Sequence, residues 1–299
     1  MIAAGAEHTA AVTEDGELYG WGWGRYGNLG LGDRNDRLIP EKVSSVGEQK
    51  MVLVACGWRH TITVSSSGGL YTYGWSKYGQ LGHGDFEDHL VPHQVEALQS
   101  SHVSQISGGW RHTMGLTSDG KLYGWGWNKF GQVGVGDNVD HCSPVQVKFP
   151  NEEKVVQISC GWRHTIAVTE RKNLFSWGRG TCGQLGHGDI LDRDSPKMIE
   201  VLSTDGSGCK EIDSLKIESV SGDSSYSLFV IFFFPHFIVS GKKTSFFALL
   251  FSTGKVWISP SERYAIVPDE KLTKELVDPV KGNGNDASVP DTDVKRIRI

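Results

Sequence analysis

The sequence of 299 residues has little of what a nucleic-acid-binding or disulfide-stabilised protein needs. Its formal net charge is −5, and a face that neutralises phosphates requires a concentration of lysine and arginine, so nucleic acid is disfavoured as the main partner. The five cysteines are odd in number and contain no C-x-x-C pair. We therefore expect reduced thiols that are mostly structural.

Export and membrane signals are also missing. The residues after Met1 form neither a basic nor an apolar leader segment, which argues against a signal peptide. Two apolar runs, 228–239 and 246–251, fall short of the roughly 18 uninterrupted residues of a spanning helix, and Pro235 and His236 break the first. We expect a protein of the cytoplasm and nucleus that does not span a membrane.

What the chain does have is 38 glycines and 10 tryptophans, a composition typical of short strands and tight turns. One pattern, an alternating segment that ends in Gly-x-x-His-Thr, occurs at 1–13, 51–65, 103–117 and 155–169. Trp58, Trp110 and Trp162 are separated by 52 residues each, a period that matches a propeller blade, and no helical period is sustained. The sequence therefore predicts an all-β propeller.

Each unit continues with a second strand signal and then a glycine loop. The loops occupy 27–33, 79–85, 131–137 and 183–189 and share the spacing Gly-x-x-Gly-x-Gly-Asp. We expect glycine there to permit positive φ and close approach of neighbouring blades, and the closing aspartates to accept bonds from nearby backbone N–H groups. A phosphate-binding role is disfavoured because no helix pattern follows the loops.

The repeats define the domain organisation that we predict. Propeller units begin near residues 1, 51, 103 and 155 and fill 1–225, with a partial fifth unit near 215. An atypical apolar insertion follows at 226–256. The composition of 257–299 is that of a flexible C-terminal tail.

Three of the four units read Gly-Trp-Arg-His-Thr, and they supply the main candidate site. Because equivalent positions of adjacent blades lie side by side, the three tryptophans should cluster, interleaved with their arginines Arg59, Arg111 and Arg163. Tryptophans of the second-strand segment are interpreted as packing residues: Trp21, Trp23, Trp75, Trp125, Trp127 and Trp177.

The histidine of each pattern is interpreted as structural. His8, His60, His112 and His164 recur once per unit, which is unlike a catalytic base or a metal ligand. Since no nucleophile and base stand out as a pair, we expect neither an enzyme nor a metal site.

The tryptophan–arginine triplets, the Gly-Gln-Leu-Gly-His-Gly-Asp loops and the segment 261–270 together resemble the plant ultraviolet-B photoreceptors of the regulator-of-chromosome-condensation propeller family. The resemblance covers residues 1 to about 200 and 257–299. It implies a seven-bladed propeller that uses no cofactor or external chromophore. It further implies a homodimer that separates in ultraviolet-B light and then binds a photomorphogenesis ubiquitin ligase with a WD-repeat propeller.

The resemblance also implies roles for particular residues. Trp110 would be the principal sensor, Trp58 its near partner and Trp162 an auxiliary. Arg111 and Arg163 would form salt bridges across the dimer, and the further residues of that interface would be Arg59, Lys77, Lys129 and Glu7. In the tail, Val267 and Pro268 would dock on the ubiquitin ligase.

Relative to that family, about three blades are expected to be missing before Met1. Four to four and a half blades should form an open arc, which would weaken dimerisation because the missing blades carry most of the acidic partners. Two alternatives therefore remain open. One is a guanine-nucleotide-exchange or chromatin-associated propeller, with weak chromatin association. The other is a light-insensitive, truncated interaction scaffold.

Overall fold

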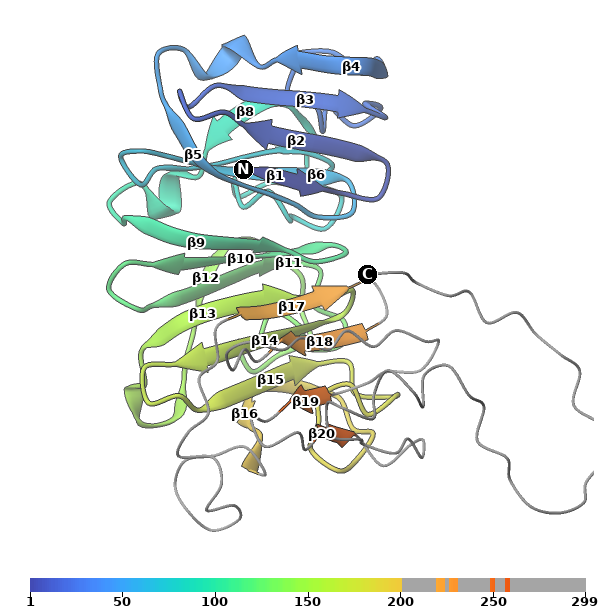
Figure 1. Cartoon of the computed structure of the whole chain (residues 1–299), viewed down its shortest axis with the longest axis vertical. Helices are drawn as coiled ribbons and strands as arrows, with labels where there is room; N and C mark the ends of the chain where they lie inside the picture. Colours follow the sequence, from blue (N-terminus) through green and yellow to red (C-terminus); the bar gives the residue numbers. More distant parts are fainter. Residues whose placement is uncertain (201–218, 224–225, 231–247, 251–255, 259–299) are drawn as a thin grey trace, which may run out of the picture.

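The computed structural model describes residues 1–200 in full and, as backbone only, strands within 219–223, 226–230, 248–250 and 256–258. Residues 1–200 form four four-stranded antiparallel sheets in sequence order (Figure 1). The first sheet comprises β1 (Ile2–Ala4), β2 (His8–Val12), β3 (Leu18–Gly22) and β4 (Arg37–Lys42). The second comprises β5 (Met51–Cys56), β6 (His60–Ser65), β7 (Leu70–Gly74) and β8 (His89–Gln94).

The other two sheets repeat this order. The third comprises β9 (Val103–Gly108), β10 (His112–Thr117), β11 (Leu122–Gly126) and β12 (His141–Val147). The fourth comprises β13 (Val155–Cys160), β14 (His164–Thr169), β15 (Leu174–Gly178) and β16 (Arg193–Met198). Three short 3₁₀ turns, η1 (Ser44–Val46), η2 (Glu96–Leu98) and η3 (Pro150–Glu152), follow the fourth strands of the first three sheets.

The four sheets are the blades of an open arc. The first strands β1, β5, β9 and β13 lie beside one another, so they form the inner edge, and the blades follow one another along the long axis of the molecule (Figure 1). The predicted all-β architecture and the open arrangement of the blades are confirmed.

Beyond the fourth blade the structure describes two hairpins. Strand β17 (Ser219–Asp223) pairs with β18 (Tyr226–Val230) and lies beside β13 and β14, at the position of the predicted fifth unit. Strands β19 (Ala248–Leu250) and β20 (Val256–Ile258) form the second hairpin within or next to the predicted insertion. Among the described residues, no helix has the length and apolar character needed to cross a membrane.

The hydrophobic core lies between the blades rather than within them. Each of three buried clusters joins one blade to the next, and each contains an aromatic residue from the third strand of the following blade: Tyr73, Trp125 and Trp177. The indoles of Trp125 and Trp177 donate to the backbone oxygens of Gln80 and Gln132, both at 3.0 Å. The packing role predicted for these two tryptophans matches their position.

Tyr73 replaces tryptophan at the first of these junctions and leaves its buried hydroxyl without a hydrogen-bond partner. Because an unsatisfied buried hydroxyl costs free energy, Tyr73→Phe is expected to raise the free energy of unfolding by about 1 kcal/mol. Tyr71→Phe is the matched control, since its hydroxyl donates to Gln49 Oε1 at 2.7 Å and its loss should destabilise. Urea unfolding measures the free energy of unfolding of both variants. A Tyr73→Phe variant less stable than the wild type would show that the Tyr73 hydroxyl does have a hydrogen-bond partner.

The glycine loops between the third and fourth strands pack against the next blade. Gly82 has φ +83°, and a Cβ there would lie 2.7 Å from Nε1 of Trp125, so only glycine fits the junction. The closing aspartates accept bonds from the residue two positions on, as predicted, with N–O distances of 2.9, 3.0, 3.0 and 3.1 Å for Asp33, Asp85, Asp137 and Asp189. These loops are therefore scaffold.

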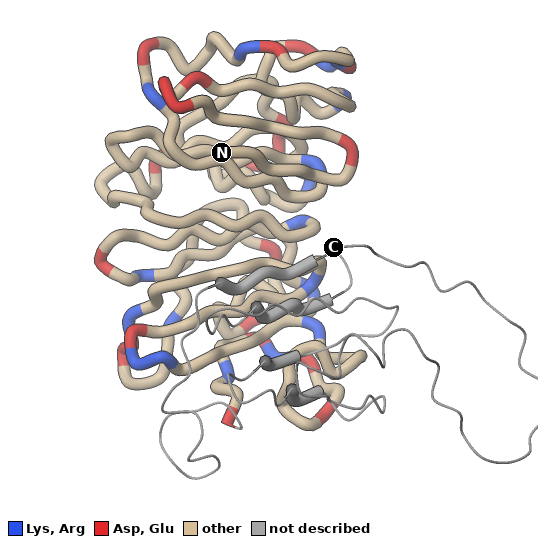
Figure 2. Tube along the Cα trace, viewed as in Figure 1, with Lys and Arg blue, Asp and Glu red and all other residues tan. Residues whose placement is uncertain are grey.

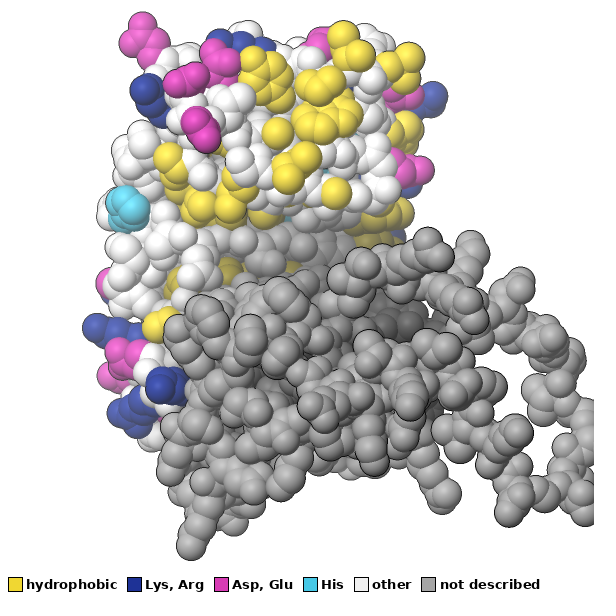
Figure 3. Space-filling model, in the orientation of Figure 1, with side chains coloured by type: hydrophobic (Ala, Val, Ile, Leu, Met, Phe, Trp, Pro, Cys, Tyr) yellow, Lys and Arg dark blue, Asp and Glu magenta, His cyan; other side chains and the backbone are white. Residues whose placement is uncertain are grey.

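The outward face of the first blade exposes apolar side chains. Leu38 is 98% and Ile39 67% exposed, and Figure 3 shows hydrophobic side chains gathered over this blade. The equivalent Leu90 in the second blade is contacted by the preceding loop, where Gly32 N donates to its backbone oxygen at 3.0 Å. The first blade thus presents the same kind of surface that is covered at the other junctions.

Candidate functional site

The candidate site is built on the loops that join the first and second strands of the last three blades. In each loop the glycine before the tryptophan lies against the histidine ring that starts the second strand. A Cβ on Gly57 would overlap the ring of His60, and Gly109 and Gly161 are equally restricted by His112 and His164. Glycine at the first position of the motif is therefore a steric requirement.

Hydrogen bonds between blades hold these loops in register. His8, His60 and His112 each pair through Nε2 with the threonine Oγ1 of the next blade, at 3.0, 2.9 and 3.1 Å. Backbone bonds link the loops directly, since Trp58 N donates to Gly109 O and Trp110 N donates to Trp162 O, each at 3.3 Å. Backbone hydrogen bonds therefore help to hold Trp58 and Trp110 in place, in addition to side-chain packing.

The structure brings Trp58, Trp110 and Trp162 together. The ring centroids of Trp58 and Trp110 are 5.5 Å apart with an interplanar angle of 56°. Those of Trp110 and Trp162 are 5.1 Å apart at 69°. Trp110 is the central ring, and both distances lie in the range in which indoles interact strongly. This is the clustering that the repeat spacing predicts.

The three arginines alternate with the rings. The guanidinium carbons of Arg59, Arg111 and Arg163 lie 3.9, 3.6 and 4.5 Å from the ring centroids of the tryptophans that precede them. Arg163 also lies 4.7 Å from the ring of Trp110. Trp110 therefore has two guanidinium groups over its ring, within the range of cation–π attraction.

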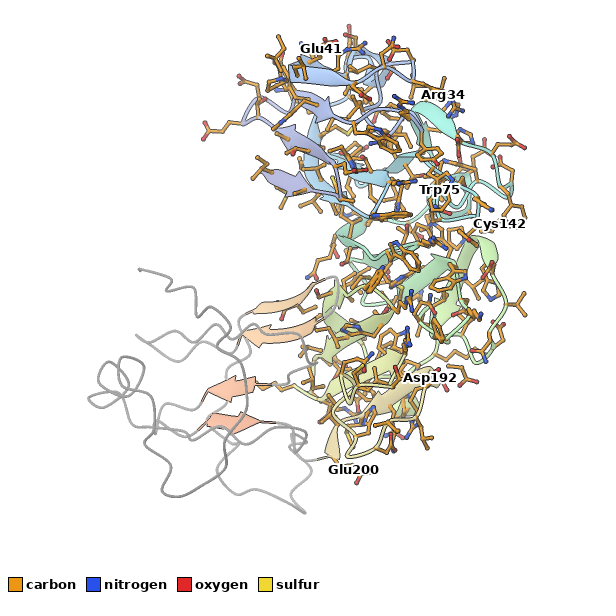
Figure 4. All side chains as sticks on the ribbon, turned by 90° about the vertical axis from the view of Figure 1, so that its right-hand side faces the viewer. Arg34, Glu41, Trp75, Cys142, Asp192 and Glu200 are labelled. Atoms are coloured by element: carbon orange, nitrogen blue, oxygen red, sulfur yellow. The ribbon has the colours of Figure 1, made fainter. Side chains whose placement is uncertain are left out.

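The three tryptophans Trp58, Trp110 and Trp162 and their three arginines form one alternating array. Three further tryptophans, for which the sequence predicts a packing role alone, also belong to this array. Trp75 lies 5.7 Å from Trp58, and Trp127 lies 5.2 Å from Trp110. Arg59 lies 4.7 Å from Trp23. Figure 4 shows Trp75 midway along the arc. These three residues therefore contact the candidate site, in addition to any packing role at the blade junctions.

Backbone geometry at the end of the third strand explains their position. Each follows a glycine in the left-handed region, for example Gly74 with φ 106° and Gly126 with φ 100°. The chain then turns toward the arginine loop, where Trp75 N donates to Arg59 O at 3.0 Å and Trp127 N donates to Arg111 O at 2.8 Å. In the sequence, the signal that indicates this position is a tryptophan directly after the glycine that ends the third strand.

Two tyrosines that no sequence pattern indicates complete the array. Tyr26 lies 5.5 Å from Trp75, and Tyr78 lies 5.5 Å from Trp75 and 6.0 Å from Trp127. Phe130 holds the equivalent place in the third blade, 5.4 Å from Trp127.

The charges of the array are unbalanced within residues 1–200. No carboxylate of that part of the chain forms an ion pair with Arg59, Arg111 or Arg163, and the Nε atom of each is buried without a hydrogen-bond partner. Burial lowers the pKa of Arg111 and of Arg163, and neighbouring arginines lower both further.

The other predicted interface residues lie at the surface. Lys77 and Lys129 are exposed at equivalent positions of the second and third blades, and Glu7 is exposed in the first. None of the three forms an ion pair with another residue of 1–200. Basic and acidic residues are interspersed along the blades (Figure 2). Val267 and Pro268 lie outside the described residues.

Burial determines the protonation of the histidines and of two of the thiols in residues 1–200. Within residues 1–200 no group of three or more His, Cys, Asp and Glu is arranged to hold a metal ion. Burial lowers the pKa to about 4 for His8 and His164 and to about 3 for His60 and His112, so these histidines are neutral near pH 7. Burial also raises the thiol pKa of Cys56 and Cys160 to about 12, which makes them poor nucleophiles.

Comparison with known proteins gives a consistent picture. A family model described as RCC1-like domain matches residues 1–228. The chain is 65% identical over its whole length to the ultraviolet-B receptor UVR8 of Arabidopsis thaliana and spans 60% of that protein. It is 34% identical over 203 residues to the E3 ubiquitin-protein ligase HERC2 of Homo sapiens, which covers 67% of this chain and 4% of the ligase.

Solved structures show the same fold. Human WBSCR16 matches with a TM-score of 0.65 and 26% identity, covering 75% of this chain and 55% of that one. Prp20p of Saccharomyces cerevisiae matches with a TM-score of 0.63 and 23% identity, covering 75% of this chain and 53% of that one.

Proposed function

The chain belongs to the RCC1-like domain family, and we propose that it is an ultraviolet-B light receptor whose absorbing group is its own tryptophan cluster. The observation that carries the proposal is the position of Trp110, whose ring centroid lies 5.5 Å from Trp58 and 5.1 Å from Trp162. The identity to a plant ultraviolet-B receptor supports it. In this proposal Trp110 is the principal sensor, Trp58 its near partner and Trp162 an auxiliary.

Light would act on this site through charge. Excitation redistributes the electron density of an indole, and Arg111, 3.6 Å from the ring centroid of Trp110, would experience that change directly. The cation–π attraction and any ion pairs made by the same guanidinium are then altered together. Because an exposed ion pair contributes only ~0–1 kcal/mol, an interface built from several such pairs can be released by a small perturbation.

The predicted consequence is a change of partner. Arg111 and Arg163, which have no carboxylate partner within residues 1–200, would pair with acidic residues of a second chain in the dark. Release of that chain, followed by docking of Val267 and Pro268 on a ubiquitin ligase, is part of the proposal, as is residence in the cytoplasm and nucleus. The chain spans 60% of the receptor that it resembles, so partners are proposed for it and not carried over.

The test is a comparison of the full chain in darkness and under ultraviolet-B light. We expect tryptophan emission and the molar mass from size-exclusion chromatography with light scattering to change on irradiation. The wavelength dependence of the response should follow the long-wavelength edge of indole absorption. A chain whose emission and mass stay constant, or that responds where indole does not absorb, would refute the proposal.

A further inference from the structure

The hydroxyl of Tyr78 makes a direct contact with the central arginine of the array. Arg111 donates from NH1 to Tyr78 Oη at 2.8 Å, and its guanidinium carbon lies 4.8 Å from the tyrosine ring centroid. The Nε atom of Arg111 is buried and has no partner. Within the described chain, the phenol oxygen is therefore the polar group that orients the guanidinium over Trp110.

The first two blades repeat this contact across their junction. Arg59 donates from NH1 to Tyr26 Oη at 3.2 Å, and both tyrosine–arginine pairs are 33 residues apart. The third blade breaks the pattern, because Phe130 stands where tyrosine is expected. Arg163 lies 5.5 Å from the Phe130 ring, which offers no oxygen to accept a bond.

The arginine positions follow the presence of the hydroxyl. Arg111 has the shorter tyrosine bond and lies 3.6 Å from its tryptophan ring centroid, and Arg59 has the longer bond and lies at 3.9 Å. Arg163 has no tyrosine and lies farthest, at 4.5 Å. A hydrogen bond from a charged donor is stronger than a neutral one, so it can fix a long side chain that would otherwise sample several rotamers.

We propose that Tyr78 and Tyr26 are positioning residues, whose hydroxyls hold Arg111 and Arg59 against Trp110 and Trp58, and that Phe130 leaves Arg163 the most loosely held arginine of the array. The proposed light response rests on these charges, so this inference deepens the proposed function. The inference predicts that the interaction between guanidinium and indole is strongest for Arg111 and Trp110 and weakest for Arg163 and Trp162.

The test is a reciprocal exchange in the full chain. Tyr78→Phe removes the central hydroxyl, Phe130→Tyr supplies one at the third site, and Tyr71→Phe is the control, because its hydroxyl bonds to Gln49 and lies outside the array. The first readout is steady-state and time-resolved tryptophan emission in the dark. The second is the quantum yield of the ultraviolet-B response, and thermal unfolding shows that each variant is folded.

We expect Tyr78→Phe to change the emission maximum and lifetime and to lower the quantum yield, because the guanidinium of Arg111 then loses the charge-assisted bond that holds it over Trp110. Phe130→Tyr should change the emission in the opposite sense, and Tyr71→Phe should leave it unchanged. The proposal is overturned if Tyr78→Phe and Tyr71→Phe have the same emission as the wild type. If the wild type shows no light response, the proposed function fails, and the dark emission still decides whether Tyr78 positions Arg111.

Discussion

Trp110→Phe is expected to abolish the ultraviolet-B response while the chain remains folded. Trp110 is the ring that contacts both Trp58 and Trp162, and it lies between Arg111 and Arg163. Phenylalanine preserves most of the packing but absorbs poorly in the ultraviolet-B range and interacts less well with cations. The measurement is the change in tryptophan emission and in molar mass on irradiation, per folded molecule.

The matched control is Trp177→Phe. Trp177 is also a tryptophan of a blade, but it is fully buried at a junction, where it donates to Gln132 O at 3.0 Å, and it lies outside the arginine array. Its loss should lower the free energy of unfolding and leave the light response per folded molecule intact. A full response in Trp110→Phe, or an equal loss in both variants, would contradict the role of Trp110.

Acidification from pH 7 to pH 5 is expected to remove most of the stability of the blades. Four buried histidines carry pKa values of about 3 or about 4, whereas an unfolded histidine titrates near 6.5. Below pH 6.5 the unfolded chain therefore binds protons that the folded chain does not, and stability falls with falling pH. The stabilising contribution is complete above pH 6.5 and is lost toward the folded pKa values.

The expected size of this effect is large. Each of these histidines contributes about 1.4 kcal/mol per pH unit below 6.5, or about 2 kcal/mol by pH 5. Together they could remove on the order of 8 kcal/mol, comparable with the total stability of a typical domain. The half-buried His83, with a pKa lowered to about 4, acts in the same direction. Urea unfolding monitored by circular dichroism between pH 7 and pH 5 measures how the free energy of unfolding changes with pH.

One variant isolates the contribution of a single buried histidine. His112→Gln should cost stability at pH 7, because the bond to Thr165 is altered, but it should reduce the pH slope by the contribution of one histidine, about 1.4 kcal/mol per pH unit. Stability that stays constant from pH 7 to pH 5 in the wild type would show that the four imidazoles are not buried as neutral groups.

The repeat made much of the architecture and of the central site predictable. A period of 52 residues marks the blades, and a propeller places equivalent positions of adjacent blades side by side. Contacts between Trp58, Trp110 and Trp162 therefore follow from periodicity alone, without knowledge of any single distance. The structural role of the histidines follows in the same way, because one residue per blade forms the same bond to the next blade.

The rest of the array depends on local backbone geometry that periodicity does not specify. The sequence predicts a packing role for Trp75 and Trp127 because they belong to the repeating second-strand segment. In the structure, a glycine with positive φ turns each toward the arginine loop. The bond between Tyr78 and Arg111 joins residues 33 apart on different blades, and no strand pattern indicates it.

The most direct test of the account is whether Trp58, Trp110 and Trp162 absorb as one unit. Circular dichroism in the indole bands should show paired signals of opposite sign, because coupled transitions at centroid distances of 5.1 and 5.5 Å split into two. Trp110→Phe should remove the paired signal, because Trp110 belongs to both close pairs. Trp58→Phe should weaken it, since Trp110 and Trp162 remain 5.1 Å apart, and Trp177→Phe should retain it. Difference spectra with the single band of one isolated indole in the first two variants would contradict the coupling and, with it, the proposed light sensor.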